Sequence, residues 1–268
     1  MKKVLVAISY SGRPPYPEYF NAQLQTWIED KSPRLKVIRY RSKIPPRIIQ
    51  MFEDKHEKLR FSERWGKLIG RVNRSVSPLI SRNIPNYSFD PTDSMLSVDT
   101  WSTVRLFGRR NLALFSWIIE ETDFDFLFAV NTSTYVNPKL LLEFIDTLDP
   151  TEELYVGAVQ KNGQSEEIFI SGAGKLFARS TLSTILKFKK RYPMDNLEDV
   201  SLGLLLKHLG ATFIDQSFLQ IENSNSVKEL NHEILNNYFY FRCKSANGVE
   251  SDVEAMRVLH DKLNGMNI

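Results

Sequence analysis

The sequence predicts an α/β fold in which helices cover both faces of a mostly parallel central sheet. Short β-rich runs alternate with stretches of helical spacing, as in residues 4–8, 17–30 and 35–38, and this order is typical of parallel strands joined by helices. A strongly apolar run at 123–130 lies between two further helical stretches, as expected of a strand buried on both faces. With 268 residues and 42% hydrophobic side chains, the chain is predicted to form a single domain over residues 1–268.

The later elements follow from local signals. Apolar spacing predicts a helix over 101–121, with a loop before it at 78–91. Asn137 followed by Pro138 is a good N-cap with a first-turn proline, and predicts a helix at 138–148. Further elements are expected as strands at 154–160, 168–171 and 211–214, a helix capped by Ser180 and ending near 187, and helices at 196–209 and 252–263.

Charge is distributed unevenly along the chain. Overall, 35 Lys and Arg accompany 32 Asp and Glu, which gives a net charge of +3. Residues 31–82 hold 15 basic and 4 acidic side chains, so a local charge of +11 leaves −8 for the remainder. We interpret 41–82 as a basic arm or insertion, and the residues from about 216 as a polar C-terminal tail. The arm predicts contact with an anionic membrane rather than with nucleic acid, because no recognisable nucleic-acid-binding motif accompanies it.

Cysteine content and hydropathy indicate the cellular compartment in which the protein is expected. The single cysteine, Cys243, excludes an internal disulfide framework and favours a reducing environment. No run approaches the roughly 20 apolar residues that a membrane-spanning helix needs. We therefore expect a cytoplasmic protein that can also lie at the inner face of the membrane.

Two clusters of small polar residues are candidates for a ligand site. Asn131, Thr132 and Ser133 directly follow the apolar strand, and ligands of open α/β sheets bind beyond the carboxyl ends of strands. The second cluster is a turn whose small side chains let a ligand approach the backbone closely. It consists of Ser171, Gly172, Ala173 and Gly174.

A third cluster is the acidic pair Glu198 and Asp199 near the start of the helix at 196–209. Acidic side chains in a first turn interact favourably with the helix dipole, which is a purely structural role. A carboxylate that faces a cleft is alternatively a general base. Spacing does not separate these two interpretations.

The order of the three clusters resembles the Fringe and β-1,3-galactosyltransferase-like family of inverting glycosyltransferases. In that family a Trp-bearing helix leads to a segment resembling DFDFLLKTDDDTYVNPENLL. This chain has Trp117 and then DFDFLFAVNTSTYVNPKLL from residue 123. A later family segment, SGAGY followed by SR, is matched by 171–174 with Arg179, and EDVYVGLCLKALG is matched by 198–210. The resemblance extends over about residues 99–215.

This resemblance implies a GT-A-type, Rossmann-like sandwich that binds a nucleotide sugar, with a UDP-sugar as the expected donor. The sugar would pass, with inversion, to a hydroxyl group of a glycan or a lipid-linked glycan. By motif position Asp199 is the candidate catalytic base, and Glu198 supports it or contacts the acceptor. The candidate donor-binding residues are Ser9, Asn131, Thr132, Ser133, Ser171, Gly172, Ala173 and Gly174.

The chain departs from the family at the metal-binding triplet. Asn131, Thr132 and Ser133 replace three acidic residues and supply no negative charge for Mn²⁺ or Mg²⁺. We therefore expect no metal cofactor, and expect basic side chains to offset the charge of the leaving pyrophosphate. The candidates are Arg105, Arg109, Arg110, Arg242 and Lys244. The same loss motivates a second hypothesis, a catalytically inactive relative that binds a nucleotide sugar or glycan or acts as a scaffold.

Overall fold

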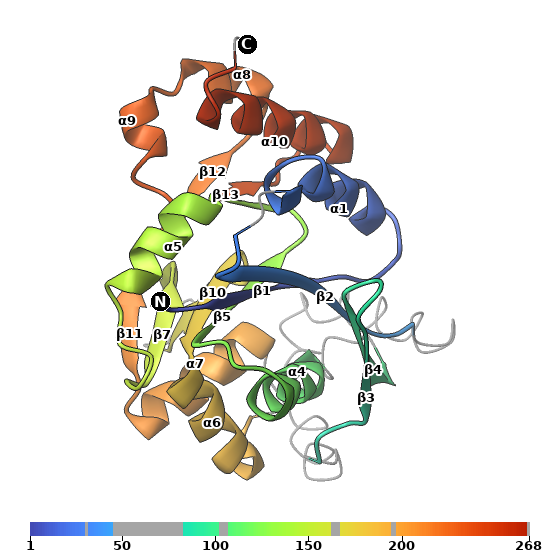
Figure 1. Cartoon of the computed structure of the whole chain (residues 1–268), viewed down its shortest axis with the longest axis vertical. Helices are drawn as coiled ribbons and strands as arrows, with labels where there is room; N and C mark the ends of the chain where they lie inside the picture. Colours follow the sequence, from blue (N-terminus) through green and yellow to red (C-terminus); the bar gives the residue numbers. More distant parts are fainter. Residues whose placement is uncertain (30–31, 45–82, 102–106, 162–166, 194–196, 267–268) are drawn as a thin grey trace, which may run out of the picture.

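The computed structural model describes residues 1–29, 32–44, 83–101, 107–161, 167–193 and 197–266. Its centre is a sheet of eight strands (Figure 1). These are β1 (Val4–Ser9), β2 (Leu35–Lys43), β3 (Tyr87–Asp90), β4 (Met95–Trp101), β5 (Phe126–Asn131), β7 (Leu154–Gly157), β10 (Gly174–Ala178) and β11 (Thr212–Asp215). They lie in the order β11-β7-β10-β5-β1-β2-β4-β3, and β10 and β3 run antiparallel to the other six. The predicted α/β fold with a mostly parallel sheet is therefore confirmed.

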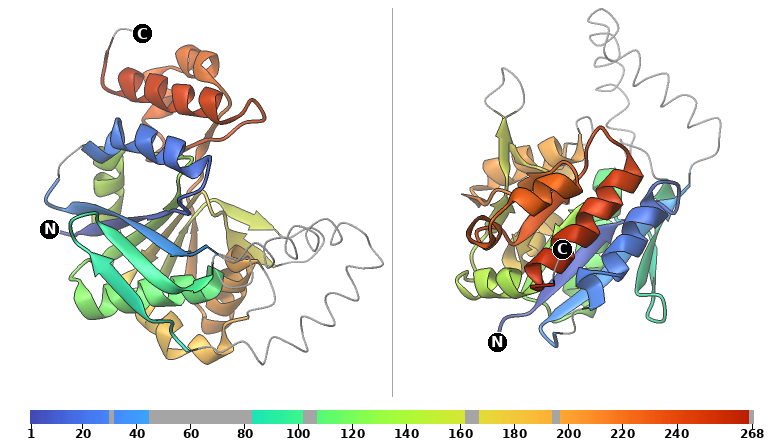
Figure 2. Two further views of the ribbon diagram at one scale, coloured as in Figure 1. Left: turned by 90° about the vertical axis from the view of Figure 1, so that its right-hand side faces the viewer. Right: turned by 90° about the horizontal axis from the view of Figure 1, so that it is seen from above.

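Helices cover both faces of this sheet, as the sequence predicts (Figures 1 and 2). One face carries α1 (Tyr16–Leu24), α5 (Pro138–Asp146) and α10 (Val249–Leu263), and the other carries α4 (Phe107–Glu121), α6 (Arg179–Lys187) and α7 (Glu198–Leu209). Alternation along β1 explains why two cores form. Val4, Val6 and Ile8 pack into the first core, whereas Leu5 and Ala7 pack into the second.

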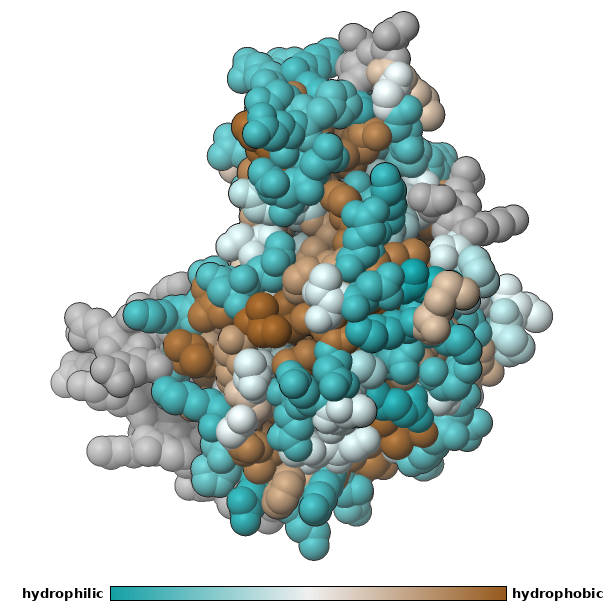
Figure 3. Space-filling view, turned by 60° about the vertical axis from the view of Figure 1, so that its left-hand side comes forward, coloured by the Kyte–Doolittle hydropathy of each residue, from teal (hydrophilic) through white to brown (hydrophobic). Residues whose placement is uncertain are grey.

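The C-terminal segment adds a small layer to the first face. A second sheet joins β6 (Thr134–Val136), β12 (Leu219–Ile221) and β13 (Tyr240–Cys243). Helices α8 (Ser224–Glu229) and α9 (His232–Leu235) connect β12 to β13, and α8 packs against α10 (Figure 1). Although this segment is polar in composition, Phe239, Tyr240 and Phe241 are buried in the first core. Figure 3 shows mainly hydrophilic side chains on one face, with hydrophobic ones gathered in a band below this layer.

Several predicted boundaries change. Trp101 ends β4 instead of starting a helix, and the described part of that helix begins at Phe107. The expected loop at 78–91 contains β3, whose alternating side chains gave too short a signal. Ser180 does not cap α6, because Ala178 is the N-cap residue and the Ser180 hydroxyl donates to the Glu152 carbonyl.

Other local predictions are confirmed. The Asn137 side chain accepts a hydrogen bond from Leu140 N at 3.2 Å and caps α5. Gly210 ends α7 with a φ of +80°, a left-handed conformation that glycine adopts without strain. The remaining elements are short: 3-10 turns η1 (Trp27–Glu29) and η4 (Lys189–Arg191), and a hairpin of β8 (Val159–Lys161) with β9 (Ile168–Ile170).

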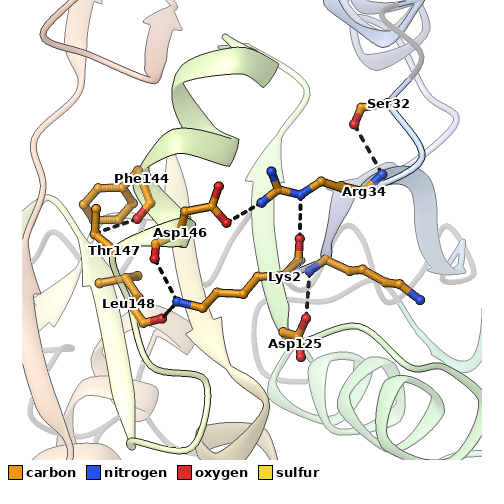
Figure 4. A network of polar contacts seen from close by, with 9 residues as sticks. Lys2, Ser32, Arg34, Asp125, Phe144, Asp146, Thr147 and Leu148 are labelled. Carbon is orange, nitrogen blue, oxygen red and sulfur yellow. Dashed lines mark hydrogen bonds and ion pairs between the residues drawn. The ribbon is translucent and has the colours of Figure 1, made fainter.

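A polar network holds the amino ends of the central strands to α5 (Figure 4). Lys2 Nζ donates to the carbonyl oxygens of Asp146, at 2.8 Å, and Leu148. Arg34 forms an ion pair with Asp146 and donates to the Lys2 carbonyl at 2.9 Å, while Lys3 N donates to Asp125 Oδ2 at 2.7 Å. The candidate site residues Ser9 and Asn131 lie at the opposite, carboxyl ends of β1 and β5.

Most of the basic arm expected at 41–82 lies outside the described residues, apart from the end of β2 and Ile44. Within the described part of the chain, no helix combines the length and the hydropathy needed to cross a membrane.

Candidate functional site

Strand register brings polar residues together at the carboxyl edge of the sheet. Ser9, the last residue of β1, is paired with Tyr40 of β2 on one side and with Asn131 of β5 on the other. Gly174 begins β10 opposite Val130, so the turn that precedes it lies beside Asn131. Two of the predicted clusters thus meet at one edge.

The third predicted cluster, Glu198 and Asp199, meets the other two because the Asp199 carboxylate lies close to the backbone of Gly172. A Cβ atom at this position would lie 2.9 Å from Asp199 Oδ2 and 3.6 Å from Asn131 Nδ2. Real Cβ contacts are almost never that short, so the carboxylate occupies space that a side chain would need. A residue larger than glycine would displace Asp199, which explains the glycine in this turn.

Four polar side chains form what we call the carboxylate cluster: Lys175, Glu198, Asp199 and Asn111. Lys175 Nζ lies 2.5 Å from Glu198 Oε2 and 2.6 Å from Asp199 Oδ1. Asn111 of α4 contacts the other oxygen of Glu198, with Nδ2 and Oε1 2.5 Å apart. The cluster connects β10, α7 and α4, and both carboxylates share one cation.

Exposure distinguishes the two acidic residues. The side chain of Asp199 is 29% exposed, against 12% for Glu198 and 7% for Lys175. Asp199 is therefore the carboxylate that a ligand can reach, with the other two behind it.

The acidic residues also differ in protonation. Burial raises the pKa of Glu198 to about 8, despite the nearby Lys175 ammonium. Burial also acts on Asp199, but the charge of Lys175 and hydrogen bonds from Glu198 and Lys175 outweigh it, so the pKa of Asp199 lies below its ordinary value. Lys175 itself is buried, yet the two carboxylates raise its pKa well above the usual value. At neutral pH the cluster thus holds an ammonium, one carboxylate on Asp199 and one proton on Glu198.

The contact between Asn111 and Glu198 fits this protonation. A separation of 2.5 Å is below the range for N–H···O and at the short end of the range for O–H···O. Asn111 Oδ1 is buried and has no hydrogen-bond partner within the part of the chain that is described. The two amide orientations have the same shape, so with the amide turned over Oδ1 accepts the one Glu198 proton whenever Asp199 does not.

Backbone contacts hold the segment after β5 in place. Gln23 Nε2 donates to the Thr134 carbonyl at 2.8 Å, and Thr134 Oγ1 donates to the Ala173 carbonyl at 2.7 Å. Cys243 N donates to the Ser133 carbonyl at 2.9 Å. Thr132 and Ser133 are buried, so this loop offers a fixed surface rather than extended polar side chains.

The loop does not fit a divalent cation. Asn131, Thr132 and Ser133 present an amide and two hydroxyls where hard cations prefer carboxylates. Across the described ranges, no group of three His, Cys, Asp or Glu side chains is arranged to hold a metal ion.

The basic candidates fall in different places. Arg110 is buried at this edge, and its Nη2 donates to Ser9 Oγ at 3.0 Å. Arg109 is half-buried, and its Nε has no hydrogen-bond partner in the described residues. Arg242, on β13 opposite Thr134, lies over the Phe218 ring at 5.9 Å, and Lys244 is exposed beyond that strand. Arg105 lies outside the described residues.

Arg179, which matches the family segment, is a structural residue. Its guanidinium donates to the carbonyl oxygens of Ile119 at 2.8 Å and Phe124 at 3.1 Å. These contacts satisfy the end of α4 and the turn into β5.

Sequence reasoning missed Lys175 and Asn111 as site residues. Lys175 stands where the family segment SGAGY has its tyrosine, so a signal was present in the motif itself. Asn111 gave no signal, because it lies among apolar residues of α4 and meets Glu198 only in the folded chain.

Comparisons with known proteins give structural likeness without sequence support. No family model matches the chain, and no curated protein matches its sequence. Among solved structures, a galactosyltransferase, LgtC, in complex with donor and acceptor sugar analogues has a TM-score of 0.46 at 8% identity, over 98% of this chain and 96% of that one. A glycosyltransferase involved in glycosylation of the major capsid of PBCV-1 has a TM-score of 0.45 at 10% identity, over 95% and 98%. The glycosyltransferase GlyE of Streptococcus pneumoniae TIGR4, in its apo form, has a TM-score of 0.44 at 10% identity, over 99% and 64%.

Proposed function

We propose that this protein is an inverting glycosyltransferase that moves a sugar from a nucleotide-diphosphate sugar, a UDP-sugar being the expected donor, to a hydroxyl group of a glycan or lipid-linked glycan. The observation that carries the proposal is the convergence of Ser9, Asn131, Gly172 and Asp199 at one edge of the sheet. These residues come from four separate stretches of sequence, and the resemblance to the Fringe-like family assigns a role to Asn131, Gly172 and Asp199.

Asp199 is the group that would accept the proton of the acceptor hydroxyl. It is the most exposed member of the carboxylate cluster and is ionised at neutral pH. As the hydroxyl oxygen forms its bond to the anomeric carbon, its proton passes to an Asp199 oxygen and the nucleoside diphosphate leaves from the opposite face. Glu198 and Lys175 hold the orientation of this carboxylate.

The turn at Ser171, Gly172, Ala173 and Gly174 would lie against the sugar, with Asn131, Thr132 and Ser133 at its diphosphate end. Gly172 leaves the Asp199 oxygens uncovered on this side. Because the 131–133 loop lacks carboxylates, transfer without Mn²⁺ or Mg²⁺ is part of the proposal.

Transfer can be tested with a panel of UDP-sugars and glycan acceptors in buffer containing EDTA. Release of UDP together with a β-linked product from an α-linked donor, identified by NMR of the anomeric proton, supports the proposal. A product with retained configuration would contradict inversion and remove Asp199 as a general base.

A second candidate is a non-catalytic relative that binds a nucleotide sugar or a glycan. The loss of carboxylates at 131–133 favours it. Calorimetry separates the two, because binding of a donor without hydrolysis or transfer across the whole panel would favour the binding protein. The membrane contact of the basic arm at 41–82 and a location at the inner face of a membrane stay predictions.

A further inference from the structure

A second buried cation lies at the same edge of the sheet. The side chain of Arg110 is enclosed between two aromatic rings, with its Cζ 4.6 Å from the centroids of both Tyr40 and Phe107. The residue is only 6% exposed. Arg110 Nη2 donates to Ser9 Oγ at 3.0 Å, so the guanidinium lies directly beyond the end of β1.

This cation is uncompensated. No carboxylate in the described part of the chain forms an ion pair with Arg110, and its Nε is buried without a hydrogen-bond partner. Burying an unpaired charge is costly, and buried arginines are normally paired. Aromatic rings recover part of this cost through cation–π attraction but leave the net charge in place. A buried site with one unmet positive charge is complementary to an anion.

The position of the charge defines the anion. Ser9, which holds Arg110, is the register partner of Asn131, the first residue of the loop that replaces the acidic triplet. The planar guanidinium fork matches the oxygens of a phosphate group, which it binds through charge-assisted hydrogen bonds. A metal ion bound at residues 131–133 would supply positive charge beside the diphosphate. The Arg110 guanidinium supplies positive charge at the end of β1, the strand next to β5.

We propose that Arg110, held by Ser9, binds the diphosphate group of the donor and takes the place of the divalent cation. This inference rests on the proposed function, because it assigns the anion to a nucleotide-diphosphate sugar. The other cation of the site, Lys175, already has the Asp199 carboxylate and the Glu198 carboxyl group as partners. Arg242 lies on β13 and Lys244 directly follows it, in the second sheet that β13 forms with β6 and β12.

Thermal unfolding and calorimetry test this site with two probes, inorganic pyrophosphate and UDP, in EDTA. The wild type should gain thermal stability with both probes. Arg110→Met, which keeps a linear side chain between the rings, should bind both probes at least about tenfold more weakly, as expected for loss of a charge-assisted hydrogen bond. Arg110→Lys should bind with intermediate affinity, and Arg257→Gln, a matched control at an exposed arginine of α10, should bind like the wild type.

In the absence of pyrophosphate and UDP, replacement of Arg110 should not lower the unfolding temperature. Removing an uncompensated buried cation relieves its desolvation cost, so Arg110→Met should unfold at the same temperature as the wild type or higher. An arginine with a purely structural role would instead lower the unfolding temperature on replacement. Nε resonances of arginine in the wild type provide a readout that needs no variant, because pyrophosphate should shift the Arg110 signal.

The outcomes separate the two proposals. Equal binding of pyrophosphate by the wild type and Arg110→Met, or no binding by the wild type in EDTA, overturns the role of Arg110. Sugar transfer that requires added Mn²⁺ would also overturn the role of Arg110, but the proposed glycosyltransferase function would stand. Binding that depends on Arg110 in a protein that transfers no sugar keeps the anion site and rejects the enzyme.

Discussion

Two buried cations lie at one edge of the sheet, and they differ in their compensation. Lys175 lies within 2.6 Å of two carboxylates, whereas Arg110 has two aromatic rings, one hydroxyl and no acidic partner among the described residues. A fully paired cation fixes the geometry of its neighbours and is part of the folded structure. An unpaired one is held at a cost in stability that a ligand can remove. The same chemical feature, buried positive charge, therefore has a structural role in one place and a binding role in the other.

The largest expected effect is on catalysis. The carboxylate cluster should control kcat, whereas Arg110 should control the affinity for the donor diphosphate. Asp199→Asn should lower kcat by about 10²–10⁴, the range for loss of a general base, and leave the affinity for UDP close to wild type. Arg110→Met should instead weaken UDP binding. Steady-state kinetics and calorimetry measure the two effects, with Glu143→Gln on the exposed side of α5 as a control. Full activity of Asp199→Asn would remove this residue as the base.

Stability should give the next largest difference. Lys175→Met leaves Glu198 and Asp199 without their shared counter-charge, and removal of one partner from a buried ion pair costs about 3–5 kcal/mol. Urea unfolding should show this loss in Lys175→Met and a change of less than about 0.5 kcal/mol in Lys207→Met, an exposed lysine of α7. If Lys175→Met is as stable as the wild type, the cluster is not the compensated site described here.

The pH dependence of stability should show the proton on Glu198. Its pKa is about 8 in the folded protein and near 4.5 when unfolded, so the folded state binds more protons between these values. The free energy of unfolding should therefore fall as the pH rises from about 4.5 to 8, with a contribution of at most about 1.4 kcal/mol per pH unit. Glu198→Gln should remove this slope, since it cannot ionise. A slope that is identical in the variant would assign the proton elsewhere.

How far the sequence predicts the site depends on the range of the interactions. Asn131 follows from position alone, because a polar residue at the carboxyl end of a buried strand faces the ligand edge of an α/β sheet. Asp199 follows from a resemblance of three ordered motifs. The fold class follows from alternating local patterns, which explains why the sheet and its helices are confirmed, whereas the short strand β3 was missed and boundaries such as Trp101 change.

No local sequence pattern shows that Lys175 is paired with acidic residues and that Arg110 is not. Arg110 was one of five basic candidates, and only the Tyr40 and Phe107 rings and the contact to Ser9 distinguish it. Lys175 looks like an ordinary strand residue until β10 and α7 pack together, since its partners follow 23 and 24 residues later. Compensation of charge is decided by tertiary contacts, so sequence patterns locate candidate charges without showing which of them are paired.

The smallest expected effect concerns Gly172, whose backbone lies against the Asp199 carboxylate. In Gly172→Ala the new Cβ would lie 2.9 Å from Asp199 Oδ2, so the carboxylate must shift by a few tenths of an ångström while the fold is kept. A displaced base weakens proton transfer, and we expect kcat to fall by about tenfold with less than about 1 kcal/mol lost in stability. Kinetics at several pH values and urea unfolding measure both. Gly203→Ala is a matched contrast, because its Cβ would lie 2.3 Å from the backbone oxygen of Ile168 and should mainly destabilise the packing of α7 on β9. If Gly172→Ala instead loses UDP affinity at unchanged kcat, Gly172 belongs with Arg110 on the diphosphate side of the site and not with the carboxylate cluster.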